Sequence, residues 1–313
     1  MLKRLLRKFH LALVIISCST LAWGDDYEPV PGVDGKIISV GSDTLASLMT
    51  FWAEGFKQQY PNVNIQIQAS GSSTAPPALT EGTANIGPMS RPLKPSEISY
   101  FVEKYGYEPT VLKVAIDAIA VFVNKQNALD GLSLKQLDSL FSVTRYCGYG
   151  QQIKRWRELN PESSSKGVIE LYGRNSVSGT YGLFKQVALC NGDFKAEVNE
   201  QPGSAAVVQS VAYSKQAIGY AAFGYKTAGV RMLPLSIDKE SYIHPTTQTI
   251  ADGSYPLSRF LYLVVNKAPS TPLPRLEKEF IRYILSSQGQ NIVKRVGYIP
   301  LSQKLIEQQV IEL

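Results

Sequence analysis

Hydrophobic and polar residues alternate along this chain in two recurring patterns. Short segments that are apolar throughout, or that alternate apolar with polar residues, are typical of strands and fall at 37–40, 63–67, 84–89, 169–172 and 217–222. Between them, apolar residues recur every three or four positions, which predicts helices at 45–56, 75–79, 94–105, 134–141, 154–160, 181–189, 207–213 and 276–293. Strands that alternate with helices predict an α/β fold with mainly parallel sheets.

Two longer apolar runs differ from this pattern. VLKVAIDAIAVFVN at 111–124 and FLYLVV at 260–265 are long enough to pass from one half of a molecule to another. We therefore expect two lobes joined by crossing strands. The first lobe would combine residues 25–113 and 257–313, and the second would hold residues 114–256.

The first residues predict export. A basic start is followed by an apolar run at 9–17, which is too short to span a bilayer, and then by the small residues of Ala22-Trp23-Gly24. Cleavage after Gly24 would remove residues 1–24 as a signal peptide and leave a soluble periplasmic protein. The alternative is that Ile15-Ile16-Ser17-Cys18 acts as a lipoprotein cleavage box, with Cys18 as a lipid anchor.

The leader also changes the charge of the chain. The formal net charge is +6 for 313 residues, and four basic residues lie in the leader, so the mature chain of 313 − 24 = 289 residues carries 6 − 4 = +2. No stretch of the mature chain combines clustered basic residues with aromatic ones, which argues against a nucleic-acid partner.

Cysteine usage points to the same compartment. Besides Cys18 the sequence has Cys147 and Cys190, and two cysteines in an oxidising environment are expected to form a disulfide. The alternative is two separate buried thiols.

Three similar turns carry the candidate chemistry. Gly41-Ser42-Asp43-Thr44 and Gly71-Ser72-Ser73-Thr74 each follow a predicted strand and precede a helix, as do Arg174 and the Ser178-Gly179-Thr180 sequence. Helix N-termini carry unpaired N–H groups and partial positive charge, which favour anions, and an arginine fork suits an oxyanion. Ligands of parallel sheets bind outside the carboxyl ends of the strands, so the three turns predict one anion site. The alternative for each turn is a plain helix cap.

Catalysis is not supported by the sequence. The mature chain has a single histidine, His244, in a loop-like HPTT setting, and GxSxG, GxxxxGK[ST] and clusters of metal ligands are absent from the sequence. We therefore expect a binding protein with no catalytic residues, no metal and no cofactor.

GSDT, GSST, GPMSRP and RNSVSGT occur in order and at similar spacing to those of the periplasmic phosphate-binding proteins of ABC transporters, and the chain resembles this family over nearly all of its mature length. The resemblance implies a type II periplasmic-binding-protein fold, with a ligand cleft between two α/β lobes. It implies a monomer that captures inorganic phosphate and delivers it to permease subunits. The ligand residues that it implies are Thr44, the backbone amide of Leu45, Ser72, Arg174, Ser178, Gly179 and Thr180.

One position departs from the family pattern. Where the family has an aspartate that accepts the proton of hydrogen phosphate, this chain has Ser90, followed by Arg91. Asp43 could replace the aspartate or could equally be a helix cap, and Arg91 could pair with Asp43 or touch the anion. The sequence therefore leaves open the selectivity for phosphate over another oxyanion such as sulfate, as well as a role as a sensor or adhesion protein.

Overall fold

The computed structural model describes residues 26–148, 150–161, 167–238, 240–311 and 313. The expected signal peptide at 1–24 and the alternative anchor Cys18 lie outside these described residues. Within them, every helix is too short or too polar to cross a bilayer.

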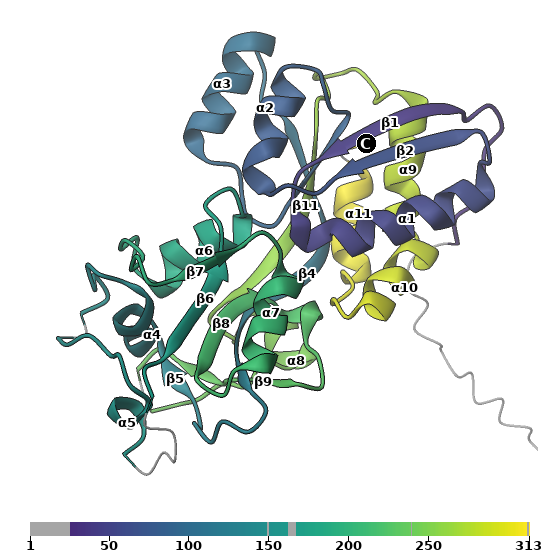
Figure 1. The fold of residues 1–313 in the computed structure, drawn as a ribbon. Helices are drawn as coiled ribbons and strands as arrows, with labels where there is room; N and C mark the ends of the chain where they lie inside the picture. Colours follow the sequence, from purple (N-terminus) through teal and green to yellow (C-terminus); the bar gives the residue numbers. More distant parts are fainter. Residues whose placement is uncertain (1–25, 149, 162–166, 239, 312) are drawn as a thin grey trace, which may run out of the picture.

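The chain forms two α/β lobes (Figure 1). In the first lobe β1 (Gly35–Val40) lies between β2 (Val63–Gln68) and β3 (Ile86–Met89), all parallel. Its helices are α1 (Ala46–Gln59), α2 (Ala75–Thr80), α3 (Pro95–Tyr105), α9 (Arg275–Leu285), α10 (Ser287–Val296) and α11 (Gln303–Ile311), with the 3-10 turns η1 (Asp43–Leu45) and η2 (Ser72–Thr74).

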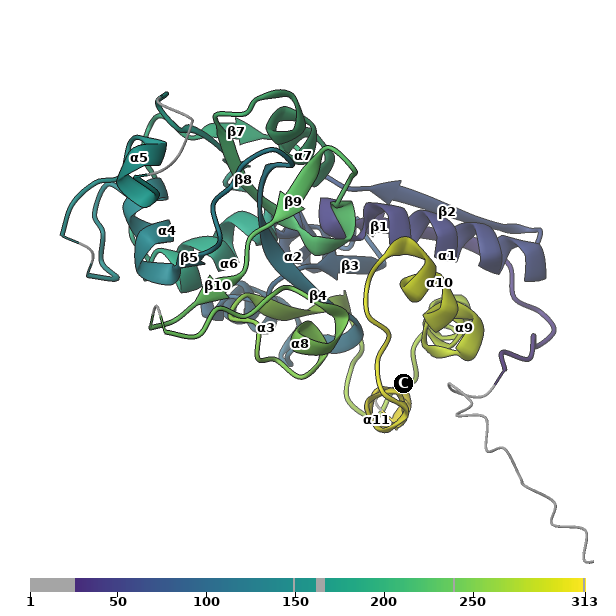
Figure 2. The ribbon, with the colours of Figure 1, turned by 90° about the horizontal axis from the view of Figure 1, so that it is seen from below.

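In the second lobe β6 (Glu170–Arg174) pairs in parallel with β7 (Asn199–Gln201) and β8 (Ala217–Ala222). Its helices are α4 (Leu134–Phe141), α5 (Trp156–Leu159), α6 (Gly179–Ala188), α7 (Ser204–Tyr213) and α8 (Thr247–Ala251). The remaining short elements are β5 (Leu132–Ser133), β9 (Val230–Met232), β10 (Leu235–Ser236) and η3 (Phe223–Tyr225). Figures 1 and 2 both place α4 and α5 at the end of this lobe farthest from α1.

The predicted crossing strands are confirmed. β4 (Thr110–Asn124) pairs with β11 (Ser258–Val265) over its first part and with β8 over its second, so one strand belongs to the sheets of both lobes. Its continuous apolar sequence fits this position, because almost the whole strand is buried. The crossing strands β4 and β11 pair antiparallel with their neighbours. The expectation of parallel sheets therefore holds for β1–β3 in the first lobe and for β6–β8 in the second, and not for the crossing strands.

The closing helix differs from its prediction. The apolar pattern at 276–293 predicts one helix, but the structure has α9 and α10 with a break at Ser286. Ser286 has extended backbone, its hydroxyl donates to the Tyr283 carbonyl at 2.7 Å, and its Oγ accepts from the Gly289 amide. A serine that caps the next helix in this way ends the first one. After the break, the Gly289 carbonyl of α10 accepts a 2.9 Å bond from the buried Trp52 indole of α1.

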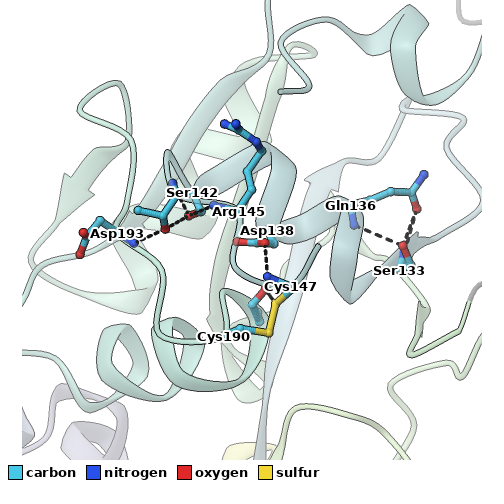
Figure 3. Close-up of a disulfide and its surroundings, with 10 residues drawn as sticks. Ser133, Gln136, Asp138, Ser142, Arg145, Cys147, Cys190 and Asp193 are labelled. Carbon is cyan, nitrogen blue, oxygen red and sulfur yellow. Dashed lines mark hydrogen bonds between the residues drawn. A yellow bond between two sulfur atoms is a disulfide. The ribbon is translucent and has the colours of Figure 1, made fainter. Parts of the chain in front are cut away.

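The predicted disulfide between Cys147 and Cys190 is confirmed (Figure 3). The two Cα atoms lie 5.3 Å apart, and the Cys147 amide donates to Asp138 Oδ2 at 2.8 Å. The bond joins the loop after α4 to the end of α6, with a sequence separation of 43. It therefore anchors the helix whose first turn carries Ser178-Gly179-Thr180.

Replacing Cys147 and Cys190 together with serine is expected to lower the free energy of unfolding by about 3–4 kcal/mol, because the open loop gains entropy in the unfolded chain. Urea unfolding of the purified mature protein measures this change. Thiol alkylation of unreduced, denatured wild-type protein provides the check. Labelling of both cysteines without a reductant would contradict the bond.

Candidate anion-binding site

The first-lobe turns are joined to one another by backbone hydrogen bonds. The Gly41 amide donates to the Gln68 carbonyl, the Ser42 amide to the Pro88 carbonyl and the Gly71 amide to the Gly41 carbonyl, at 2.8–2.9 Å. These bonds connect the carboxyl ends of β1, β2 and β3. The predicted convergence of the turns on one place is therefore confirmed for this lobe.

Hydroxyl groups crowd this edge of the sheet. Ser42 Oγ donates to Ser90 Oγ at 3.0 Å, the Ser90 amide donates to Ser72 Oγ at 3.0 Å, and the Ser72 and Ser90 hydroxyls lie 3.2 Å apart. All three serines are buried. Because each hydroxyl can both donate and accept, the cluster can adjust its donors to a partner. The Leu45 amide, expected to face the anion, donates to the Ser42 carbonyl at 3.3 Å.

The second lobe meets this edge at the start of α6. Ser178 caps the helix by accepting from the Thr180 and Tyr181 amides, at 3.1 and 3.4 Å. Gly179 touches the first lobe so closely that an added Cβ would lie 2.3 Å from Ser72 Oγ. Thr180 Oγ1 lies 3.2 Å from Thr44 Oγ1. The two lobes are therefore closed on each other, with threonine hydroxyls facing across the cleft.

Arg174 ends β6 and is 1% exposed. Its Nη1 lies 3.0 Å from Asp43 Oδ2 and donates to Ser204 Oγ at 3.0 Å, while Nη2 donates to the Pro202 carbonyl. The Nε–H is buried and has no partner within the described residues. Burial lowers the pKa of the Arg174 guanidinium, the Asp43 carboxylate raises it, and the positive charge of Arg259 lowers it further. Arg174 nevertheless stays charged, because arginine does not lose its proton in proteins.

Asp43 connects the lobes. Ser42, rather than Asp43, caps the helix that starts here, so the interpretation of Asp43 as the cap of its own helix is wrong. Its Oδ2 instead accepts from the Ser204 amide at 3.1 Å, at the N-terminus of α7 in the other lobe. Burial raises the pKa of the Tyr225 hydroxyl to about 12, so this hydroxyl remains protonated and donates to the Asp43 carbonyl at 3.2 Å.

Arg91 is not paired with Asp43. Its guanidinium donates to both carboxylate oxygens of Glu97, at 2.6 and 2.8 Å, and to Ser73 Oγ at 3.1 Å. Glu97 is three residues into its helix and also accepts from the Lys94 amide, so it is fixed next to Arg91. Asp43, by contrast, is held by Arg174 on the other lobe.

Another buried arginine near the cleft, Arg259, was not predicted from the sequence. Arg259 of β11 pairs with Asp117 of β4, and its Nη1 donates to Thr180 Oγ1 and to the Ser90 carbonyl, both at 3.1 Å. A signal was present, because Asp117 is the single acidic residue within a long apolar run. A charge in such a strand must be paired when it is buried.

The described residues contain no group of three or more histidine, cysteine or acidic side chains that could hold a metal ion. His244 is exposed in the loop before α8. The polar side chains described at the cleft are hydroxyls, which donate and accept hydrogen bonds, and the ion pairs Arg174–Asp43 and Arg259–Asp117.

Comparison with known proteins agrees with this geometry. A model of the PBP superfamily domain matches residues 28–288. The phosphate-binding protein PstS of Pseudomonas aeruginosa is 55% identical over 291 residues, which cover 92% of this chain and 90% of that protein. The chain belongs to the PstS family of phosphate-binding proteins. The family resemblance drawn from the four sequence motifs is confirmed.

Solved structures support the assignment to the PstS family. One described as a phosphate ABC transporter substrate-binding protein from Clostridium perfringens with bound phosphate matches with a TM-score of 0.70 at 28% identity, over 86% of this chain and all of that one. An ABC-type phosphate transport receptor from Vibrio cholerae shares the fold, with a TM-score of 0.65 at 24% identity, over 85% of this chain. The two-lobed periplasmic-binding fold is thus confirmed. The matched PstS relatives are named as binding proteins, in agreement with the expectation that the chain is not an enzyme.

Proposed function

We propose that this protein captures inorganic phosphate in the cleft between its lobes and delivers it to the permease of an ABC transporter. The observation that carries the proposal is the buried Nε–H of Arg174, a charged donor without a protein partner in the described chain, on a second-lobe side chain that also contacts Asp43 of the first lobe. The name and bound ligand of the relatives support phosphate as the anion. We further propose export to the periplasm as a monomer, with lobes formed by 25–113 plus 257–313 and by 114–256.

The proposed ligand set combines groups of both lobes. Its members are Thr44, the Leu45 amide, Ser72, Ser90, Arg174, Ser178, Gly179 and Thr180. Asp43 pairs with Arg174, and Arg91 follows Ser90 in the chain. Each charge-assisted hydrogen bond contributes about 1.5–3 kcal/mol, whereas micromolar affinity corresponds to about 8 kcal/mol in total. A few such bonds among buried side chains therefore suffice for tight binding.

The test of capture is calorimetric titration of mature protein freed of bound anions by unfolding and refolding. We expect one phosphate per chain with micromolar or tighter affinity. Deletion of the gene from its host is expected to reduce phosphate uptake at low external phosphate. Tight binding with normal uptake would separate capture from delivery and contradict the transport role.

Sulfate discrimination is expected to be incomplete. Ser90 stands where the family has a carboxylate, and Asp43 Oδ2 is already engaged by Arg174 and the Ser204 amide. A hydroxyl can accept the proton of hydrogen phosphate, but it can also rotate to donate to sulfate, which a carboxylate would repel. We therefore expect sulfate to compete with phosphate at millimolar concentration.

Ser90→Asp tests this reason for weak discrimination. The added carboxylate is expected to weaken sulfate binding by at least about tenfold relative to phosphate, because it repels an anion that has no proton to donate. Competition calorimetry of both anions against both proteins measures the ratio. An unchanged ratio would show that position 90 does not face the anion.

A further inference from the structure

A buried ion pair joins the two crossing strands next to the cleft. Arg259 and Asp117 are register partners of β11 and β4. Arg259 Nε and Nη2 both donate to Asp117 Oδ2, at 2.9 and 2.7 Å, and the side chains are 4% and 0% exposed. Two of the three guanidinium nitrogens are thus fixed by Asp117, so the third has a defined direction.

The third nitrogen reaches both lobes. Arg259 Nη1 donates to the Ser90 carbonyl after β3 and to Thr180 Oγ1 at the start of α6, each at 3.1 Å. The first contact lies in the first lobe and the second in the second lobe. One nitrogen therefore contacts two of the proposed ligand segments at once.

This contact sets the direction of a hydrogen bond. A guanidinium has donors only, so Thr180 Oγ1 must accept from Arg259. The hydrogen of the Thr180 hydroxyl is then left to donate, either to Thr44 Oγ1 at 3.2 Å or to an oxyanion. Without Arg259, both acceptor lone pairs of Thr180 Oγ1 would be open to other donors such as Thr44, and its hydrogen would be less restricted in direction.

Stability alone does not explain the pair. Buried ion pairs contribute little net stability compared with well-packed apolar residues, and the neighbouring positions of β4 are apolar. Burial lowers the pKa of the Arg174 guanidinium, and the positive charge of Arg259 lowers it further. An anion close to both side chains would favour their charged forms.

We propose that Arg259, held by Asp117, is a positioning residue for oxyanion recognition that acts through the Thr180 hydroxyl and the Ser90 turn. The inference rests on the proposed anion-binding function. Arg259 occupies one acceptor site of the Thr180 hydroxyl and thereby restricts the direction of its hydrogen, and its simultaneous bonds to Ser90 and Thr180 favour the closed arrangement of the lobes.

A double-mutant cycle with phosphate tests the inference. The neutral-pair variant D117N/R259Q removes both charges, so no lone buried charge remains. It is expected to bind phosphate at least about tenfold more weakly than wild type, since an oriented donor is lost. Thr180→Val should also weaken binding. The combined variant should lose much less than the product of the two effects, because Arg259 acts through the hydroxyl that T180V removes.

Two further variants make the cycle decisive. Arg259→Lys retains the positive charge but has one nitrogen, which cannot contact Asp117, Ser90 and Thr180 together, so at least about tenfold weaker binding is expected here too. It replaces the neutral pair if that variant does not fold, as judged by circular dichroism. Arg282→Gln, which removes the ion pair with Glu279 away from the cleft, is the control and should bind as wild type does.

The outcomes separate the two proposals. Wild-type protein that binds phosphate, together with folded D117N/R259Q or Arg259→Lys variants that bind it equally well, overturns the role of Arg259 and leaves phosphate capture standing. Fully multiplicative effects of D117N/R259Q and T180V overturn action through Thr180. Wild-type protein that binds neither phosphate nor sulfate overturns both proposals.

Discussion

Replacement of Arg174 by alanine is expected to weaken phosphate binding by at least about tenfold while the protein remains folded. The Nε–H of Arg174 is buried without a partner among the described residues, Nη1 contacts Asp43 and Ser204, and Nη2 donates to the Pro202 carbonyl. Loss of one charge-assisted bond costs about 1.5–3 kcal/mol, and each 1.4 kcal/mol corresponds to about a factor of ten. Calorimetry of the mature variant measures the change in affinity.

Arg231→Ala is the matched control for this prediction. Arg231 is also a strand arginine of the second lobe, but it donates to the backbone carbonyls of Asn127 and Leu129, away from the cleft. Its replacement is expected to change stability and to leave phosphate affinity within about twofold. Equal affinities of wild type and Arg174→Ala would remove Arg174 from the site.

A methyl group at Gly179 is expected to prevent closure and to reduce phosphate affinity by about a hundredfold or more. The added Cβ would lie 2.3 Å from Ser72 Oγ and 2.6 Å from Ser90 Oγ, closer than real atoms approach. These contacts form only when the lobes meet, so the open protein should fold normally. Calorimetry gives the affinity, and small-angle scattering with saturating phosphate shows whether the lobes still close.

Gly182→Ala controls for the helix itself. Gly182 lies three residues further along α6, and its added Cβ would be 3.5 Å from Arg91 Cδ, an ordinary contact. Alanine stabilises a helix relative to glycine by about 0.5–1 kcal/mol, so this variant should be slightly more stable. If both variants bind phosphate equally well, close contact at Gly179 is not part of the bound state.

Local sequence patterns predicted the parts of the site that each turn contains. The local signal is a strand followed by glycine and hydroxyl residues and then by a helix. This signal identified Thr44, Ser72 and Thr180, which lie where the two lobes contact each other. The crossing strand at 111–124 was predicted from its length and apolar character. These features depend on residues that are close in sequence, so periodicity and turn chemistry suffice to find them.

The partners of these turns could not be predicted in the same way. Arg259 and Asp117 are 142 positions apart and meet only through the antiparallel register of β4 and β11. The sequences of two apolar strands do not show which residues will pair with each other. Asp43 likewise meets Arg174 and Ser204 only when the lobes close. Such contacts depend on tertiary arrangement, although the isolated acidic residue of β4 did indicate that a partner must exist.

The most direct test of the account is a crystal structure of the mature protein with phosphate. We predict one phosphate between the lobes, within hydrogen-bond distance of Arg174 Nε and of the hydroxyls of Thr44 and Thr180, with Gly179 of the second lobe in contact with Ser72 of the first. A phosphate bound to one lobe only, or at a place that none of these three residues contacts, would contradict it.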